Sequence, residues 1–98
     1  MRITGGVHRG RIIKVPDGLE VRPTQDRVRE ALFNIIQNEI RGARFLDVFA
    51  GSGAVGLEAL SRGAVSCVFV EQRRDAQALI RENIKTCGFQ DSSRVVAG

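Results

Sequence analysis

The sequence lacks most of the features that mark membrane, disulfide-rich and metal-binding proteins. No hydrophobic run approaches the roughly 18–20 residues of a transmembrane helix, and no signal-peptide hydrophobic region follows Met1. The two cysteines, Cys67 and Cys87, lack the spacing of metal ligands, and we expect both to be buried free thiols. The single histidine, His8, lies in a glycine-flanked turn and is expected at the surface. These absences favour a cytoplasmic protein that binds neither metal nor membrane.

The positive charge is concentrated in the first half of the chain. The 98 residues suffice for at most one domain, and their net charge is +4. Residues 1–44 hold nine Lys or Arg and five Asp or Glu, whereas residues 45–98 hold six of each. Thirteen of the fifteen cations are arginines, which suit phosphate contact and stacking on bases. This pattern predicts a polyanion-binding arm, with an ordinary solvated hairpin as the alternative.

Residues 1–22 predict a basic β-hairpin. Short strands at 3–4 and 11–15 flank a polar segment with glycines at both ends, and a turn follows at 16–18. A two-stranded arm buries little apolar surface and is marginal alone. We therefore expect it to lean on residues 23–98 or on a partner.

A helix is predicted from the N-cap Thr24 to about Ile40, ending at Gly42. Helical spacing predicts a buried apolar face and an opposite polar face. The apolar face consists of Val28, Leu32, Ile35, Ile36 and Ile40, and the polar face of Arg27, Glu30, Asn34 and Gln37.

The remainder alternates between strands and helices. Near-continuous apolar strands at 45–49, 65–70 and 94–97 alternate with helices at about 53–62 and 74–87. Such alternation predicts an α/β fold whose parallel sheet is covered by helices on both faces. Right-handed crossovers would place Asp47 and Glu71 at the same carboxyl edge. Because three strands make only half of a doubly wound sheet, we expect either a fragment or a second chain that supplies the rest.

Three arginines fall near the ends of these predicted helices. Arg62, Arg73 and Arg74 are expected to be solvated charges with no role in a site.

A glycine turn between the first strand and its helix predicts a nucleotide-cofactor site. The turn Gly51-Ser52-Gly53 lets backbone approach a ligand closely, and the following helix offers unpaired N–H groups to negative charge. Glu71, after the next strand, is placed to accept hydrogen bonds from ribose hydroxyls.

Asp47, at the end of the first strand, bears on which cofactor binds. The glycine spacing also fits a dinucleotide, but a carboxylate beside a pyrophosphate would cost on the order of several kcal/mol. S-adenosylmethionine has no phosphate, and its ammonium group could pair with Asp47. The remaining alternative is a purely structural turn in which Asp47 caps the helix.

Four ordered blocks of the sequence resemble the N-terminal half of the RsmD-type methyltransferases. The blocks are RITGGVHRGRIIKVP, RPTQDRVREALFNII, FLDVFAGSGAVGLEALSRGA and VFVEQRRDA. The resemblance implies a Rossmann-like class I S-adenosylmethionine-dependent fold with an N-terminal hairpin. It also implies methylation of a guanine exocyclic N2 in small-subunit (16S) ribosomal RNA.

The resemblance also implies roles for individual residues. Those that match the family's cofactor motifs, or lie beside the methionine end of the cofactor, are Asp47, Ala50, Gly51, Ser52, Gly53, Glu71, Thr24 and Arg27. The basic arm implies RNA contact through Arg2, Arg9, Arg11, Lys14 and Arg22. The family's catalytic Asp/Asn-Pro-Pro-Tyr/Phe segment is absent from these residues, so none of them is assigned a catalytic role.

Two other functions stay open at this point. One is an NAD(P)-dependent oxidoreductase, which the glycine spacing permits. The other is a non-catalytic RNA-binding module in which the sheet only supports the arm. The sequence does not indicate an oligomeric state.

Overall fold

The computed structural model describes residues 1–15, 23–48 and 50–98. The order of elements is α1 (Pro23–Ile40), β1 (Arg44–Val48), α2 (Ala54–Ser61), β2 (Ser66–Val70), α3 (Arg74–Cys87), the short 3-10 helix η1 (Gln90–Ser92) and β3 (Ser93–Val96). Every helix and strand other than η1, which was not predicted, lies within one or two residues of its predicted range. The predicted turn at 16–18, Arg22 and Phe49 lie outside the described residues.

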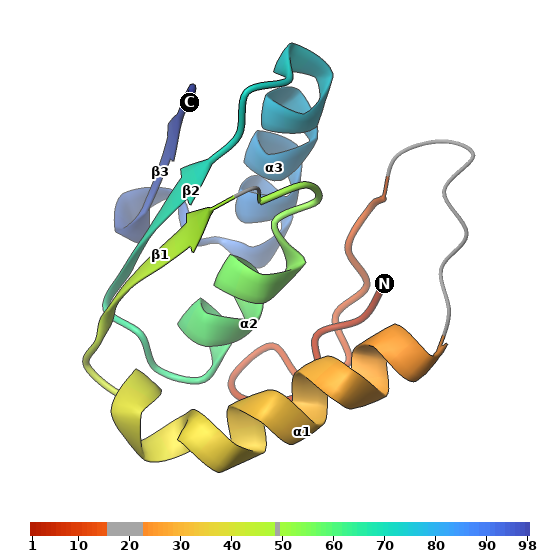
Figure 1. Cartoon of the computed structure of the whole chain (residues 1–98), viewed down its shortest axis with the longest axis vertical. Coiled ribbons are helices and arrows are strands. Elements are labelled where there is room, and N and C mark those ends of the chain that lie inside the picture. Colours follow the sequence, from red (N-terminus) through yellow and green to blue (C-terminus); the bar gives the residue numbers. More distant parts are fainter. Residues whose placement is uncertain (16–22, 49) are drawn as a thin grey trace.

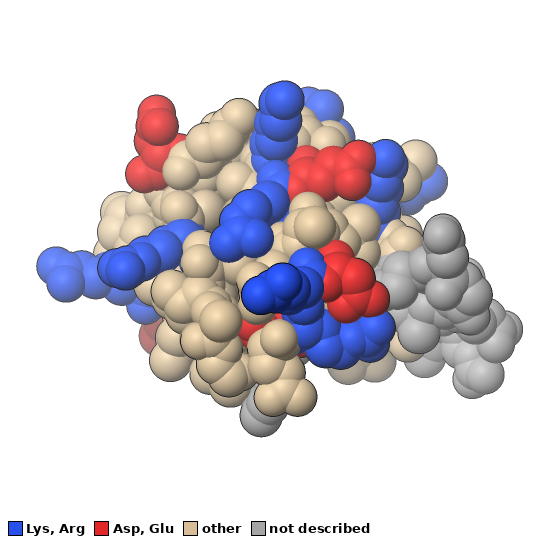
Figure 2. All heavy atoms as spheres, turned by 90° about the horizontal axis from the view of Figure 1, so that it is seen from above, with Lys and Arg blue, Asp and Glu red and all other residues tan. Residues whose placement is uncertain are grey.

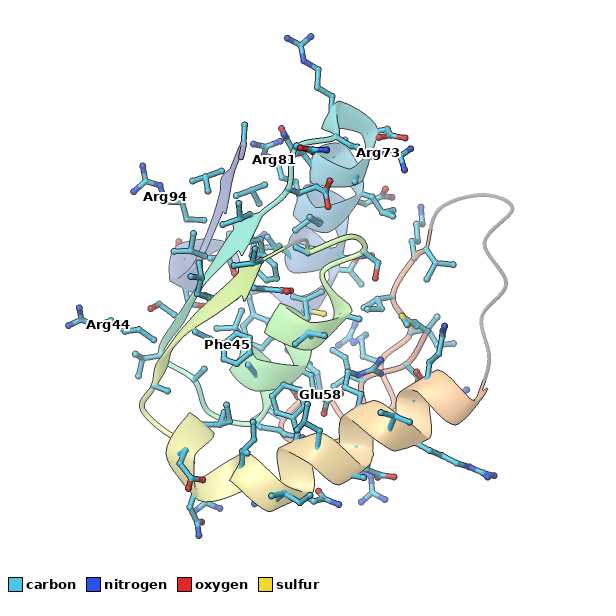
Figure 3. All side chains as sticks on the ribbon, viewed as in Figure 1. Arg44, Phe45, Glu58, Arg73, Arg81 and Arg94 are labelled. Carbon is cyan, nitrogen blue, oxygen red and sulfur yellow. The ribbon has the colours of Figure 1, made fainter. Side chains whose placement is uncertain are left out.

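The three strands form a parallel sheet in the order β1-β2-β3 (Figure 1). Phe45, Cys67 and Phe69 face one side, where α2 contacts β1 and β2 and α3 contacts β3. The expected covering of both faces is therefore wrong for the described residues, because these helices share one side. On the open side Leu46 is 61% exposed and Val48 is 50% exposed. Arg44 and Arg94 project from this side (Figure 3).

The first helix presents only part of its predicted apolar face to the core. Phe33 and Ile40 are buried and Ile36 is partly buried, whereas a stripe of apolar side chains faces solvent. The exposed stripe consists of Val28, Leu32 and Ile35. A buried arginine, Arg29, lies on the inner face instead, because it forms an ion pair with the buried Glu58 of α2.

The N-terminal arm, residues 1–15, packs against the helices. Arg2 and Ile12 form one antiparallel bridge, and the N–H of Ile3 donates to the carbonyl of Arg11 at 2.9 Å. The predicted hairpin is thus present, but with a single bridge in place of regular strands. Ile3 is 1% exposed and Ile13 is 2% exposed, so both belong to the hydrophobic core. This confirms that the arm leans on the rest of the chain.

Candidate functional site

The glycine turn lies at the carboxyl edge of the sheet, between β1 and α2. Gly53, at φ 84°, precedes the first residue of α2, and Gly51 also has a positive φ of 59°. The peptide N–H of Gly53 donates to the carbonyl of Ala50 at 2.8 Å, which closes the turn. No described residue accepts a hydrogen bond from the N–H groups of Ala54 and Val55. The turn therefore offers backbone donors at the N-terminus of a helix, where an anionic group is stabilised.

Glu71 supports this turn from the neighbouring strand. One carboxylate oxygen accepts the N–H of Gly51 at 3.0 Å, and the other accepts the N–H of Arg73 at 3.0 Å. Hydrogen bonds from the Arg73 and Gly51 N–H groups hold the pKa of Glu71 below its ordinary value. The side chain is thus a fixed, ionised acceptor beside the turn. Further lone pairs on its oxygens could accept ribose hydroxyls.

Asp47 lies beneath the turn, on the covered side of the sheet. Its carboxylate accepts the N–H of Gly56 at 3.0 Å, and the residue is only 7% exposed. Burial raises the pKa of Asp47, the Gly56 hydrogen bond opposes this rise, and the charge of Glu71 adds to it. This geometry is the helix cap that the sequence left open as an alternative. It weakens the argument that Asp47 selects a cationic cofactor, and direct pairing with an ammonium group stays a prediction.

Gly56 allows α2 to pack closely on the sheet. A Cβ atom added there would lie 2.3 Å from the Phe69 ring and 2.7 Å from the sulfur of Cys67. A larger residue at this position would push α2 away from β2, the strand that precedes Glu71. Cys67 and Cys87 are both buried free thiols, as predicted.

The other predicted site residues are not shown to point into a cofactor site. Arg27 is exposed on α1, and nothing is described of the Thr24 side chain. Ser52 Oγ contacts the sulfur of Met1 at 3.8 Å, so the start of the arm passes close to the turn. Ala50 is buried, at 9% exposure. A role for these residues in cofactor binding remains a prediction.

The cations of the arm differ in how they are paired. Arg2, Arg9 and Arg11 are exposed, and no carboxylate among the described residues pairs with them. Lys14 donates to Glu82 at 2.5 Å, and this contact raises the pKa of Lys14. Seen from the carboxyl edge of the sheet, basic side chains are interspersed with acidic ones (Figure 2).

His8 is half-buried, with its ring 5.0 Å from that of Phe89.

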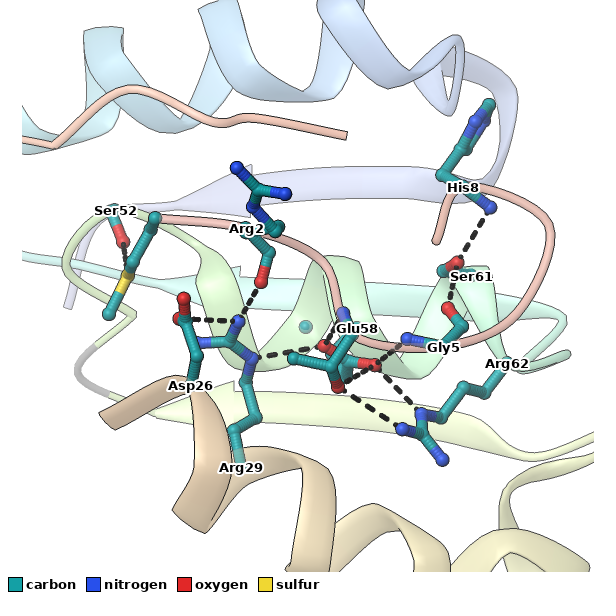
Figure 4. Close-up of polar contacts among 12 residues, drawn as sticks. Arg2, Gly5, His8, Asp26, Arg29, Ser52, Glu58, Ser61 and Arg62 are labelled. Atoms are coloured by element: carbon teal, nitrogen blue, oxygen red, sulfur yellow. Dashed lines mark hydrogen bonds and ion pairs between the residues drawn. The ribbon is translucent and has the colours of Figure 1, made fainter. Parts of the chain in front are cut away.

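A buried carboxylate, Glu58 of α2, docks the arm and α1. It is 0% exposed and accepts hydrogen bonds from the N–H of Thr4 at 2.9 Å and the N–H of Gly5 at 3.0 Å. Arg29 donates to it at 3.0 Å and Arg62 at 2.7 Å (Figure 4). The expectation that Arg62 is a solvated helix-end charge is wrong, because this ion pair buries it. Arg73 and Arg74, by contrast, are exposed as expected.

Sequence reasoning missed Glu58, and it missed Asn83 of α3. The signal for Glu58 is a carboxylate four residues before Arg62 within an otherwise apolar helix. The signal for Asn83 is a polar residue on the apolar stripe of α3 that contains Ala76, Ile80 and Cys87. Both side chains contact the arm, which joins distant parts of the sequence.

The described residues form no group of His, Cys, Asp and Glu that could hold a metal ion. None of the described helices combines the length and the hydrophobicity needed to cross a bilayer.

This arrangement of sheet, glycine turn and carboxylate defines a Rossmann-like domain, and the solved structures that resemble it place it in the class I methyltransferase fold. The C-terminal domain of precorrin-6Y C5,15-methyltransferase from Rhodobacter capsulatus has the same fold, with a TM-score of 0.68 and 30% identity over 84% of this chain and 42% of that chain. A hypothetical protein of Thermus thermophilus is more similar, with a TM-score of 0.82 and 46% identity over 100% of this chain and 55% of that chain.

The chain belongs to the family described as conserved hypothetical protein 95, which matches residues 1–98. It is 50% identical to ribosomal RNA small subunit methyltransferase D of Escherichia coli K12, over 88% of this chain and 43% of that protein. These matches confirm the resemblance to the RsmD-type methyltransferases. The chain spans about half the length of the curated relatives it matches.

Proposed function

We propose that the full-length protein is an S-adenosylmethionine-dependent methyltransferase that modifies guanine N2 in small-subunit ribosomal RNA, in the cytoplasm. The observation that carries this proposal is the hydrogen bond between the buried carboxylate of Glu71 and the Gly51 N–H, which attaches Glu71 to the glycine turn that leads into α2. The family membership supports a methyl donor over a dinucleotide.

The chain's own residues would bind and orient the cofactor. The N–H groups of Ala54 and Val55, which no described residue accepts, would meet a carboxylate, and Glu71 would accept ribose hydroxyls. The sulfonium of the cofactor supplies an already activated methyl group. Alignment of that group with the base would then be the main catalytic effect, for which well-oriented reactions gain up to about 7–11 kcal/mol. The arm would contact RNA phosphates through its exposed arginines, which is the role we propose for Arg2, Arg9 and Arg11.

We also propose that the remainder of the full-length protein covers the apolar surfaces left open here. These surfaces are the uncovered side of the sheet, the free edge of β1 and the exposed stripe of α1. Hydrogen exchange tests this proposal, because amides on the free edge of β1 should exchange more slowly in the full-length protein than in the isolated 98 residues. Equal exchange rates in the two would contradict it.

Calorimetric titration of the full-length protein with S-adenosylhomocysteine tests the proposed cofactor. Glu71→Gln should weaken binding about 10–100-fold, the range that hydrogen bonds to a charged group contribute. Asp75→Asn is the matched control, because this carboxylate is exposed and pairs only locally with Arg73. Undiminished affinity of Glu71→Gln would remove Glu71 from the site. Tighter binding of NADH than of S-adenosylhomocysteine by the unmodified protein would favour an oxidoreductase instead.

A further inference from the structure

Asn83 joins the arm, the glycine turn and α3 through one side-chain amide. The side chain is 1% exposed. Its Oδ1 accepts the N–H of Lys14 at 2.9 Å, and its Nδ2 donates to the carbonyl of Lys14 at 2.9 Å. The same Nδ2 donates to the carbonyl of Ser52 at 2.9 Å. All the hydrogen-bonding groups of this amide are therefore directed at backbone.

The bond to Ser52 fixes the peptide that leads into α2. The carbonyl of this Ser52–Gly53 peptide is held by Asn83, and its N–H is held by Ala50. Glycine tolerates both signs of φ, so a peptide next to Gly53 could otherwise rotate at little steric cost. Rotation would leave the Asn83 amide with an unused buried donor and would turn the Ser52 carbonyl away. The N–H groups of Ala54 and Val55 follow directly, so their direction depends on this peptide.

We propose that Asn83 is a positioning residue. It holds the glycine turn so that the N–H groups of Ala54 and Val55 point toward the cofactor, and it links this turn to the arm. This inference rests on the proposed function, since it concerns the same cofactor site. The backbones of Lys14 and Ser52 both hydrogen-bond to the side-chain amide of Asn83. A ligand that orders the turn therefore also orders the end of the arm. The arm is then better ordered for RNA when the cofactor is bound.

The first experiment compares two neighbouring substitutions in the full-length protein. Asn83→Asp has the same shape and keeps the acceptor for the Lys14 N–H, but it replaces the donor with an oxygen that faces two carbonyls. Ile84→Val is the control, because it removes one buried methylene from α3 without touching these bonds. We expect Asn83→Asp to bind S-adenosylhomocysteine at least about tenfold more weakly, and Ile84→Val to bind within about twofold of wild type.

The second experiment uses hydrogen exchange in the unmodified protein. Saturation with S-adenosylhomocysteine should slow exchange of the Lys14 N–H, and Asn83→Asp should abolish this effect. A purely structural Asn83 would lower stability without linking Lys14 to the ligand. If Asn83→Asp fails to fold, the wild-type measurement still decides, because an unchanged Lys14 rate overturns the proposal. Wild-type affinity in Asn83→Asp also overturns it, whereas no binding by the wild-type protein would instead refute the proposed function.

Discussion

Replacing the buried carboxylate Glu58 with glutamine should strongly destabilise the protein. The substitution preserves shape but removes the charge that two buried arginines, Arg29 and Arg62, share. It also places an NH2 group where only hydrogen-bond donors converge, including the N–H groups of Thr4 and Gly5. Removing one partner of a buried ion pair typically costs about 3–5 kcal/mol, because the other charge stays buried. We expect a loss of that size in the free energy of unfolding.

Urea unfolding followed by circular dichroism measures this loss in the full-length protein. Glu82→Gln is the matched control, since its side chain pairs with Lys14 at the surface, with exposures of 51% and 68%. The control should change stability little, because water screens the pair. In addition, the amides of Thr4 and Gly5 should exchange faster in Glu58→Gln and not in Glu82→Gln. Equal stability of the two variants would refute the reasoning about the network.

The pH dependence gives a second readout of the same group. Burial alone would raise the pKa of Glu58, but hydrogen bonds from Arg62, Thr4 and Arg29 bring it below its ordinary value of 4.5. The unfolded chain therefore binds a proton more readily than the folded one does. The contribution of Glu58 is complete above pH 4.5 and is lost as the pH falls through the lower, folded pKa. The difference in stability between wild type and Glu58→Gln should shrink over that range.

Three other substitutions or measurements probe separate features. Gly56→Ala should destabilise the protein by about 1–3 kcal/mol by overpacking α2 against β2, measured by urea unfolding. Burial and the charge of Asp47 raise the pKa of Cys67 to about 12, so iodoacetamide should label this thiol at pH 8 only after unfolding; rapid native labelling would contradict its burial. Arg9→Ala and Arg11→Ala should each flatten the salt dependence of RNA binding, by a slope of about 0.7 for single-stranded RNA, and an unchanged slope would exclude that phosphate contact.

The positions of the helices and strands could be predicted from neighbouring residues, as α3 illustrates. The helix predicted at about 74–87 is observed at Arg74–Cys87, and Gly88, at φ 71°, ends it in the left-handed region. The carboxyl edge that brings Glu71 to the glycine turn also follows from the handedness of parallel crossovers. These features depend on a few neighbouring residues and on general chirality.

The inner face of α1 could not be predicted in the same way. Of the predicted apolar face, Ile36 and Ile40 do lie against the core, but Val28, Leu32 and Ile35 are exposed. The buried face also includes Arg29, whose charge is paired with Asp26, one turn before it, and with a fully buried partner, Glu58 of α2. That partner lies 29 positions away in the sequence, so no local pattern reveals it.

The role of Asp47 at the candidate site could not be predicted from the sequence either. A carboxylate before a glycine turn can meet a ligand or the turn's own helix, and both arrangements have the same sequence. The structure has the second arrangement, in which Asp47 accepts the Gly56 N–H from beneath. The choice between a methyl donor and a dinucleotide therefore rests on the family and not on this side chain.

The attachment of the arm bears on how RNA and cofactor binding are related. An arm that only added RNA contacts could be held by exposed side chains, yet this one is fixed by buried groups on both helices that flank the turn. Glu58 and Ser61 hold its beginning and middle to α2, and Asn83 holds its end to α3. Because α2 starts at the turn and Asn83 bonds the turn directly, displacing the arm would break hydrogen bonds to both elements that hold the candidate cofactor turn. The surface that would bind RNA and the loop that would bind the methyl donor thus depend on the same buried polar groups.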